Sequence, residues 1–240
     1  MKSLLKHDRG NIDGLLLFGG LVRDTKPIVG WSDIDLIVVF CDALRRNVGA
    51  IAEAISYAHN NYGIRVDMTQ LGSCELSDPS EVRHCFNNEI LNALSNRPIV
   101  SQVIYGTIPS FQVSAEQEKL AALYYVGDTI HKLRRFIAES VGTSHDDAHL
   151  RQCLARTTRW LFSVIRASLR LFGIYRHPYE PSLHEVAKLF PEIDLSLPWM
   201  LVAFRTSPQD FCVDESLFIR SESFVVGFRQ TILSRLGSTS

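Results

Sequence analysis

Residues 15–40, LLLFGGLVRDTKPIVGWSDIDLIVVF, carry the strongest strand and turn signals in the N-terminal half of this chain. It contains two apolar runs, 15–18 and 34–40, which have the length of strands and few polar positions, as strands covered on both faces do. Gly19-Gly20 ends the first run, and the segment between the runs, with its proline and glycine, is typical of a loop. We therefore expect two strands of one sheet, joined through a glycine turn.

The residues that follow extend this unit. Asp42 is predicted to cap a helix, in which apolar residues recur at three- and four-residue steps from Leu44 to Ala58, and Gly63 stands where that helix should end. A third strand is expected over 64–71, a helix over 81–94 and a further strand over 99–105. The order of elements predicts a small sheet flanked by helices.

After about residue 113 the pattern becomes helical. Ser114 and Gln117 form a capping-box pattern that opens one helix, and a long apolar stripe over 150–172 predicts the next. Ser182 and Glu185 predict the start of a third helix, and 222–236 a fourth. The fold class that follows is α+β: a small mixed-sheet domain, residues 1–112, followed by an all-α helical bundle, residues 113–240.

Composition narrows the function classes. The 240 residues include 25 Lys+Arg and 26 Asp+Glu, a net charge of −1, and 46% are hydrophobic, so bulk disorder is excluded and no field for binding bulk nucleic acid or an anionic membrane is expected. Five scattered cysteines without a C-x-x-C pair argue against a disulfide framework. No secretory signal and no run long enough to span a membrane is visible, so a cytoplasmic protein is expected.

Three aspartates carry the chemistry. Asp33 and Asp35 are two residues apart in a predicted strand, so their carboxylates project from one face, where they repel each other unless a cation lies between them. Asp67 lies in the middle of the next predicted strand. If that strand pairs beside the first, three carboxylates converge. Oxygen ligands of this kind suit Mg²⁺, and such a cluster can hold two metal ions for phosphoryl-type displacement.

The glycine turn complements these acids. Gly19 and Gly20 let the backbone approach a phosphate chain closely, so that the following N–H groups can donate to it. Arg23, three residues on, supplies a planar cation for a phosphate oxygen. Glycine, acids and arginine together suit a nucleoside triphosphate.

The motif pattern resembles that of the DNA polymerase β-like nucleotidyltransferase superfamily, in particular its minimal and kanamycin nucleotidyltransferase types. It consists of Gly19-Gly20, a spacing of twelve residues, Asp33-Ile34-Asp35 and a separate strand that contains Asp67. The resemblance covers about residues 15–70. It implies Mg²⁺-dependent transfer of a nucleoside monophosphate from an NTP, with ATP the expected one, to a hydroxyl of a small molecule or protein. By position, the three aspartates are the catalytic metal ligands, with Asp67 suited to accept the hydroxyl proton. The resemblance also implies that Gly19 and Gly20 form the triphosphate-binding turn. Arg23 is expected to bind the nucleotide with them, and the helical bundle is expected to bind the acceptor or a partner.

The sequence leaves alternatives open. Most small relatives have serine in place of Gly20, which favours a non-catalytic NTP-binding regulatory or antitoxin-like module of the same fold as the second interpretation. Arg170 and His177 resemble the R-x4-6-H motif of HEPN-type ribonucleases, but Leu171 follows where many such motifs have a polar residue. A basic residue near a helix C-terminus and a loop histidine are the favoured explanation of the pair. A homodimer and a partner protein both remain open, as does the acceptor.

Overall fold

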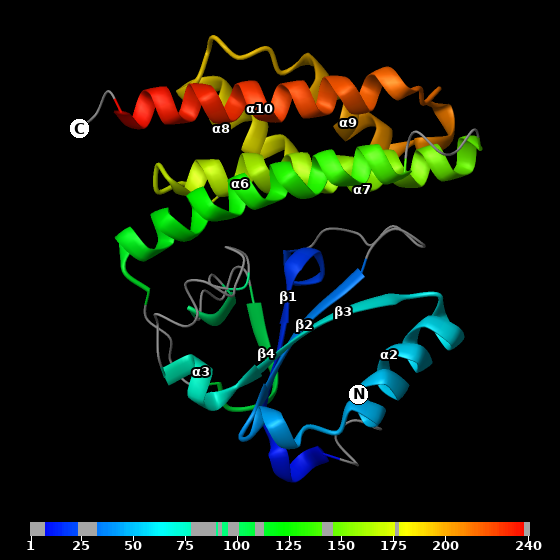
Figure 1. Cartoon of the computed structure of the whole chain (residues 1–240), viewed down its shortest axis with the longest axis vertical. Helices are drawn as coiled ribbons and strands as arrows, with labels where there is room; N and C mark the ends of the chain where they lie inside the picture. The colour runs from blue at the N-terminus through cyan, green and yellow to red at the C-terminus, as the bar shows by residue number, and fades with distance from the viewer. Residues whose placement is uncertain are drawn as a thin grey trace. The chain divides into compact units, whose positions relative to one another are not determined.

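The computed structural model describes residues 8–23, 33–77, 90, 93–95, 101–108, 113–140, 146–175 and 178–237. The chain divides into two compact units, Met1–Ala121 and Ala122–Ser240. The first contains a four-stranded mixed sheet and the second is helical (Figure 1). The α+β class expected from the sequence is confirmed.

The sheet of the first unit has the strand order β3-β2-β1-β4. Its strands are β1 (Ile12–Phe18), β2 (Asp33–Phe40), β3 (Arg65–Gly72) and β4 (Ser101–Gly106). β1 runs antiparallel to both β2 and β4, whereas β2 and β3 are parallel. Short 3-10 turns follow or precede the strands: η1 (Arg9–Asn11), η2 (Gly19–Arg23) and η3 (Ala43–Arg45). The four strands predicted from the sequence are therefore present, and the central pair lies between two edge strands.

Both faces of the sheet are covered, which explains why its central strands are apolar runs. Helix α2 (Val48–Tyr62) packs through Ala50, Ile51 and Ala54 against one face of the sheet. The opposite face carries a second cluster of buried side chains, which also includes residues of α3 (Ser73–Ser77) and the first turns of α6 (Ala115–Ser140). Its members are Leu16, Phe18, Ile37, Val39, Leu71, Leu76, Ile90, Ala93, Leu94, Ile108 and Ala121.

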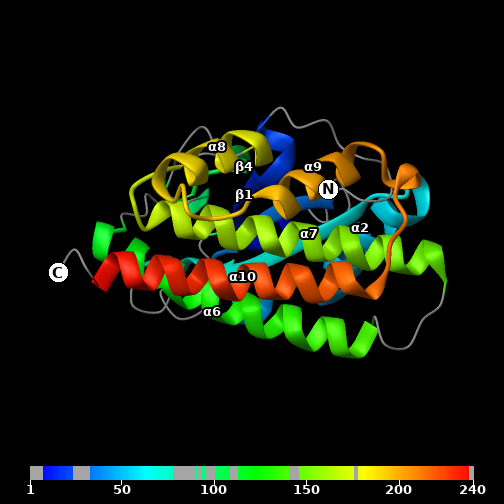
Figure 2. The same ribbon diagram turned by 90° about the horizontal axis from the view of Figure 1, so that it is seen from above.

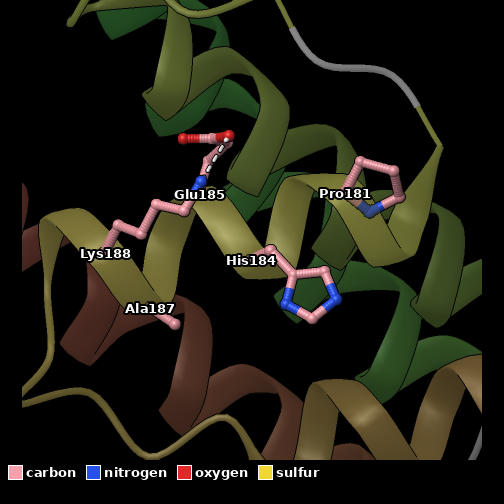
Figure 3. Close-up of a pocket in the computed structure, with 5 residues that line it drawn as sticks. All are labelled: Pro181, His184, Glu185, Ala187 and Lys188. Atoms are coloured by element: carbon pink, nitrogen blue, oxygen red, sulfur yellow. Dashed lines mark hydrogen bonds and ion pairs between the residues drawn. The ribbon is translucent and has the colours of Figure 1, made fainter.

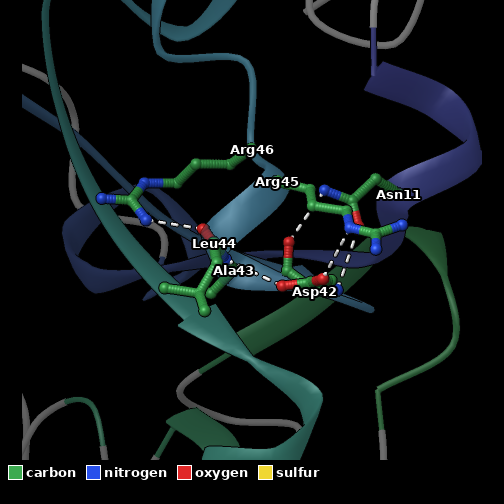
Figure 4. Close-up of polar contacts among 6 residues, drawn as sticks. All are labelled: Asn11, Asp42, Ala43, Leu44, Arg45 and Arg46. Atoms are coloured by element: carbon green, nitrogen blue, oxygen red, sulfur yellow. Dashed lines mark hydrogen bonds and ion pairs between the residues drawn. The ribbon is translucent and has the colours of Figure 1, made fainter.

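The start of α2 differs from the prediction. Asp42 caps only the η3 turn, where it accepts a hydrogen bond from the Leu44 backbone N–H (2.9 Å), while Asn47 caps α2 by accepting from Ala50 N–H (3.0 Å). Arg46, between them, has an extended backbone (φ −59°, ψ 141°), so the helix cannot run through it. Leu44, expected on the buried stripe, is consequently 93% exposed. Figure 4 shows the polar contacts around this turn.

The second unit consists of the rest of α6, α7 (Asp147–Arg170), α8 (Tyr179–Leu189), α9 (Ser196–Thr206), a 3-10 turn η4 (Pro208–Asp210) and α10 (Glu215–Gly237). α7 is the central helix: it packs against α8, α9 and α10, and it lies side by side with α10 in Figure 2. Arg134 of α6 pairs with Glu222 of α10 (2.8 Å). The predicted helical bundle is therefore present.

Helix starts were predicted unevenly. The Ser114–Gln117 capping box is confirmed, because Gln117 N–H donates to Ser114 Oγ (3.1 Å) and Ser114 N–H to Gln117 Oε1 (2.9 Å). The Ser182 box is wrong: α8 begins earlier, at Tyr179, and Ser182 Oγ donates back to the Pro178 carbonyl (3.0 Å).

Two other helices were mispredicted in the second unit. α10 begins at Glu215 and not at 222. At this start, Asp214 accepts a hydrogen bond from Leu217 N–H (3.2 Å). Helix α9 was not predicted, because Pro198 interrupts its pattern, although proline costs no hydrogen bond in a first helical turn. The helix expected over 81–94 lies mostly outside the described residues. None of the helices in the described part of the chain combines the length and the apolar character that a membrane-spanning helix requires.

Candidate functional site

One end of the sheet gathers the predicted acids, and we call it the acidic end. It is formed by the last residue of β1 and the first residues of β2 and β3. In the parallel pairing of β2 with β3, Asp35 lies opposite Asp67, and Asp33 lies opposite Arg65. Partners across neighbouring strands project from the same face, as do residues two apart in one strand. All three carboxylates therefore project from one face of the sheet.

That face is the one that carries Ile37, Val39 and Leu71 further along the same strands. The row of side chains thus changes from fully buried to charged toward the acidic end: Asp33 and Asp35 are half-buried, and Asp67 is exposed. Three like charges in adjacent positions repel one another, and a cation between them would reduce that cost. The sequence predicted that the three carboxylates converge if the strand of Asp67 pairs beside that of Asp33 and Asp35. β3 does pair with β2, and this pairing brings Asp67 to the other two.

Gly19 lies directly beside these acids. β1 pairs with β2 so that Phe18 faces Asp35, and Gly19 then turns away with a φ of +79°, a conformation that favours glycine. A Cβ at this position would lie 2.8 Å from Cγ of Asp35, with the Oδ2 oxygen nearer still. Gly20 is exposed. The η2 turn ends at Arg23, whose side chain lies outside the described part of the chain, as do residues 24–32.

The acidic end offers the right donors for Mg²⁺, since carboxylate oxygens are the ligands that this hard ion prefers. Within the described residues, however, no group of three or more histidine, cysteine or acidic side chains is placed to hold a metal ion as it stands. The donor chemistry and the shared face fit a divalent cation, and the carboxylates would have to close around it. Arg65, exposed at the start of β3, is a cation on this face that the sequence analysis did not single out. Only the strand register reveals it.

The opposite end of the sheet holds a second polar cluster, which we call the capped end. Asp13 accepts hydrogen bonds from the Cys41 thiol (2.8 Å) and from the Ser73 hydroxyl. These bonds, that from Cys41 first, lower the pKa of the Asp13 carboxyl. The same contact raises the pKa of the Cys41 thiol. Because each polar group here is satisfied by a neighbour, this cluster is suited to hold three chain segments together.

Polar and aromatic groups of the helical unit meet around Tyr179. Its ring stacks on Phe162 at 4.0 Å, and the guanidinium carbons of Arg205 and Arg166 lie 4.5 Å and 5.6 Å from its centre. Arg170, half of the HEPN-like pair, is buried at the end of α7, while His177 lies outside the described residues. The described residues therefore give no geometric support to the ribonuclease interpretation. The residues around Tyr179 come from three helices, so no local sequence signal could have found them.

A shallow hollow lies on α8, lined by Pro181, His184, Glu185, Ala187 and Lys188 (Figure 3). Glu185 and Lys188 pair with each other across it (3.2 Å). The His184 ring meets Trp199 edge-on at 5.3 Å. None of the residues predicted for the site lines this hollow, and its charged pair is already neutralised. It does not belong to the acidic end.

Comparison with known proteins adds little to this geometry. No family model matches the chain, and no curated protein matches it. Among solved structures, a chain in a crystal structure of a mutant of the toxin-antitoxin MntA-HpeT aligns with 50% of this chain and 76% of its own, at 15% identity and a TM-score of 0.29. A TM-score this low carries no argument about fold or activity. The fold class rests on the strands and helices described above.

Proposed function

We propose that this chain has a nucleotidyltransferase-like fold and is a Mg²⁺-dependent nucleotidyltransferase. It would transfer a nucleoside monophosphate from an NTP, expected to be ATP, to a hydroxyl of a small molecule or protein. The observation that carries the proposal is the register of β2 with β3, which sets Asp35 opposite Asp67 on the face that also carries Asp33. The glycine turn against Asp35 is the second support.

The proposed roles follow from where these side chains lie. Asp33, Asp35 and Asp67 would hold the divalent ion, which supplies positive charge to the phosphate oxygens. Asp67, the most exposed of the three, is suited to accept the proton of the acceptor hydroxyl. Gly20 and Arg23 are proposed to contact the phosphate chain, and Gly19 lies in the same turn. Positioning and electrostatic stabilisation supply most of the rate in phosphoryl transfer, so few further groups are required.

A non-catalytic NTP-binding module is the second candidate. The observation in its favour is Gly20, an exposed residue of the turn at a position where serine is usual in the resembling family, because the missing hydroxyl removes one donor to the phosphates. Such a module, in a homodimer or with a partner protein, would bind Mg²⁺-NTP and yield no product.

The test uses the full chain with each of the four NTPs labelled at the α-phosphate, Mg²⁺ and a cell extract. We expect label to pass to one acceptor, with pyrophosphate released. Asp35→Asn should lower the rate by roughly a hundredfold to a thousandfold, because it removes a charged ligand from the divalent ion that would stabilise the transition state. Glu53→Gln is the matched control, since Glu53 is exposed on α2 and its loss removes the same charge elsewhere. Equal labelling by Asp35→Asn would contradict the proposal, and NTP binding without any labelled product would favour the second candidate.

A further inference from the structure

The two glycines of the turn have different surroundings. Gly19 is buried, whereas Gly20 is exposed. A Cβ built on Gly19 would meet Asp35 alone among its three nearest atoms, at 2.8 Å from Cγ and 3.1 Å from Cβ, with Oδ2 nearer than either. Real Cβ atoms essentially never lie within 3.0 Å of another heavy atom, and both Oδ2 and Cγ would lie inside that distance. The Asp35 carboxylate therefore occupies the space that a side chain at position 19 would take.

We propose that Gly19 is a positioning residue for Asp35. The carboxylate of Asp35 occupies the space that a side chain at position 19 would fill, and we call this space the seat. The part of this proposal that concerns metal binding rests on the proposed function. Asp35 is the central acid, opposite Asp67 across the strands and two residues from Asp33. A methyl group at position 19 would push the carboxylate out of this row. Gly20 is left to contact phosphate, so the paired glycines have separate tasks.

A second glycine of the same unit provides a matched control. Gly63 ends α2 with a φ of +63°, close to the +79° of Gly19, but a Cβ there would meet no atom within 4 Å. Alanine at either position carries the strain of a left-handed backbone. Only alanine at position 19 also collides with a carboxylate. The difference between the two variants isolates the contact with Asp35.

The first experiment measures binding of Mn²⁺ alone to the full chain by electron paramagnetic resonance, without nucleotide. We expect Gly19→Ala to weaken Mn²⁺ binding at least tenfold, and Gly63→Ala to stay within twofold of wild type. Unchanged Mn²⁺ affinity in Gly19→Ala would overturn the seat. If the wild-type chain does not bind Mn²⁺, the metal part of the proposed function fails, and the second experiment decides the seat by itself.

The second experiment is a double-mutant cycle on the midpoint of urea unfolding, which needs no metal. Gly19→Ala should lower the midpoint strongly in the wild-type chain. In the Asp35→Ala background its effect should shrink by at least half, because Oδ2 and Cγ have gone and only the Cβ of residue 35, at 3.1 Å, still crowds the added methyl group. Equal effects in both backgrounds overturn the proposal. Should Gly19→Ala fail to fold, folding of the double variant supports the seat and its failure to fold contradicts it.

Discussion

The two ends of one small sheet use aspartates in opposite ways. At the capped end, Asp13 is hydrogen-bonded by Cys41 and Ser73, and Asp42 by Leu44 N–H. At the acidic end, Asp35 and Asp67 face each other across two strands, so like charges are adjacent. Hydrogen bonds to a carboxylate favour its charged form and stabilise the fold, whereas adjacent carboxylates destabilise it. The neighbours of an aspartate, hydrogen-bond donors at one end and further carboxylates at the other, therefore indicate whether its role is structural or functional.

Stability and function should accordingly separate along the sheet. Removing a carboxylate from the capped end leaves donors without a partner, which costs stability. Removing the Asp67 carboxylate from the acidic end relieves its repulsion with Asp35, so we expect activity to fall while stability is kept. Residues that lower stability in order to act are common at functional sites. Substitution of Asp67, substitution of Asp13 and a change of pH each test this difference between the two ends.

Asp67→Asn should have the largest effect. Loss of a general base lowers the rate by about a hundredfold to ten-thousandfold. We expect nucleotidyl transfer to fall within that range, while the urea midpoint stays the same or rises, because one like charge beside Asp35 has gone. The rate is measured by pyrophosphate release and the midpoint by circular dichroism.

The control for this variant is again Glu53→Gln, which should change neither quantity. A large fall in the urea midpoint of Asp67→Asn would show that this carboxylate holds the fold together. The contrast between the two ends would then be wrong, whatever the effect on the rate.

Asp13→Ala should show the reverse pattern. It removes the carboxylate that accepts hydrogen bonds from Cys41 and Ser73. These two bonds join the start of β1 to the ends of β2 and β3. Bonds to charged groups contribute about 1.5–3 kcal/mol each at most, so a loss of about 1–3 kcal/mol in the free energy of unfolding is expected. The transfer rate at saturating substrate should be unchanged. A variant as stable as wild type would show that the capped end is not structural.

Much of this arrangement could be predicted from the sequence, for a physical reason. Successive residues of a strand point to opposite faces, so every second residue of β2 lies on one face. This period alone places Asp33, Asp35, Ile37 and Val39 together. Asp67 needed only the pairing of two neighbouring strands. The Ser114–Gln117 box was predicted because both of its bonds are local.

The rest depended on contacts that are distant in sequence or on local signals that compete. Asp42 and Asn47 are both good capping residues five positions apart, and the extended backbone of Arg46 decides between them. The seat at Gly19 requires the antiparallel register of β1 with β2, which no local pattern contains. The same holds for Asp13, whose partners lie 28 and 60 residues away.

The smallest expected effect is a pH dependence at the capped end. The pKa of Asp13 is lowered in the folded chain from an ordinary value of 3.8, so its charge stabilises the fold above that pH, and this contribution is lost as the pH falls through the folded value. Asp13→Asn keeps one carbonyl oxygen but does not titrate. The difference in unfolding free energy between wild type and this variant should therefore be constant at neutral and mildly acidic pH and shrink below 3.8. Urea unfolding at a series of pH values measures it, with Glu53→Gln run in parallel. A difference that does not shrink in acid would mean that shape, and not charge, is what Asp13 contributes.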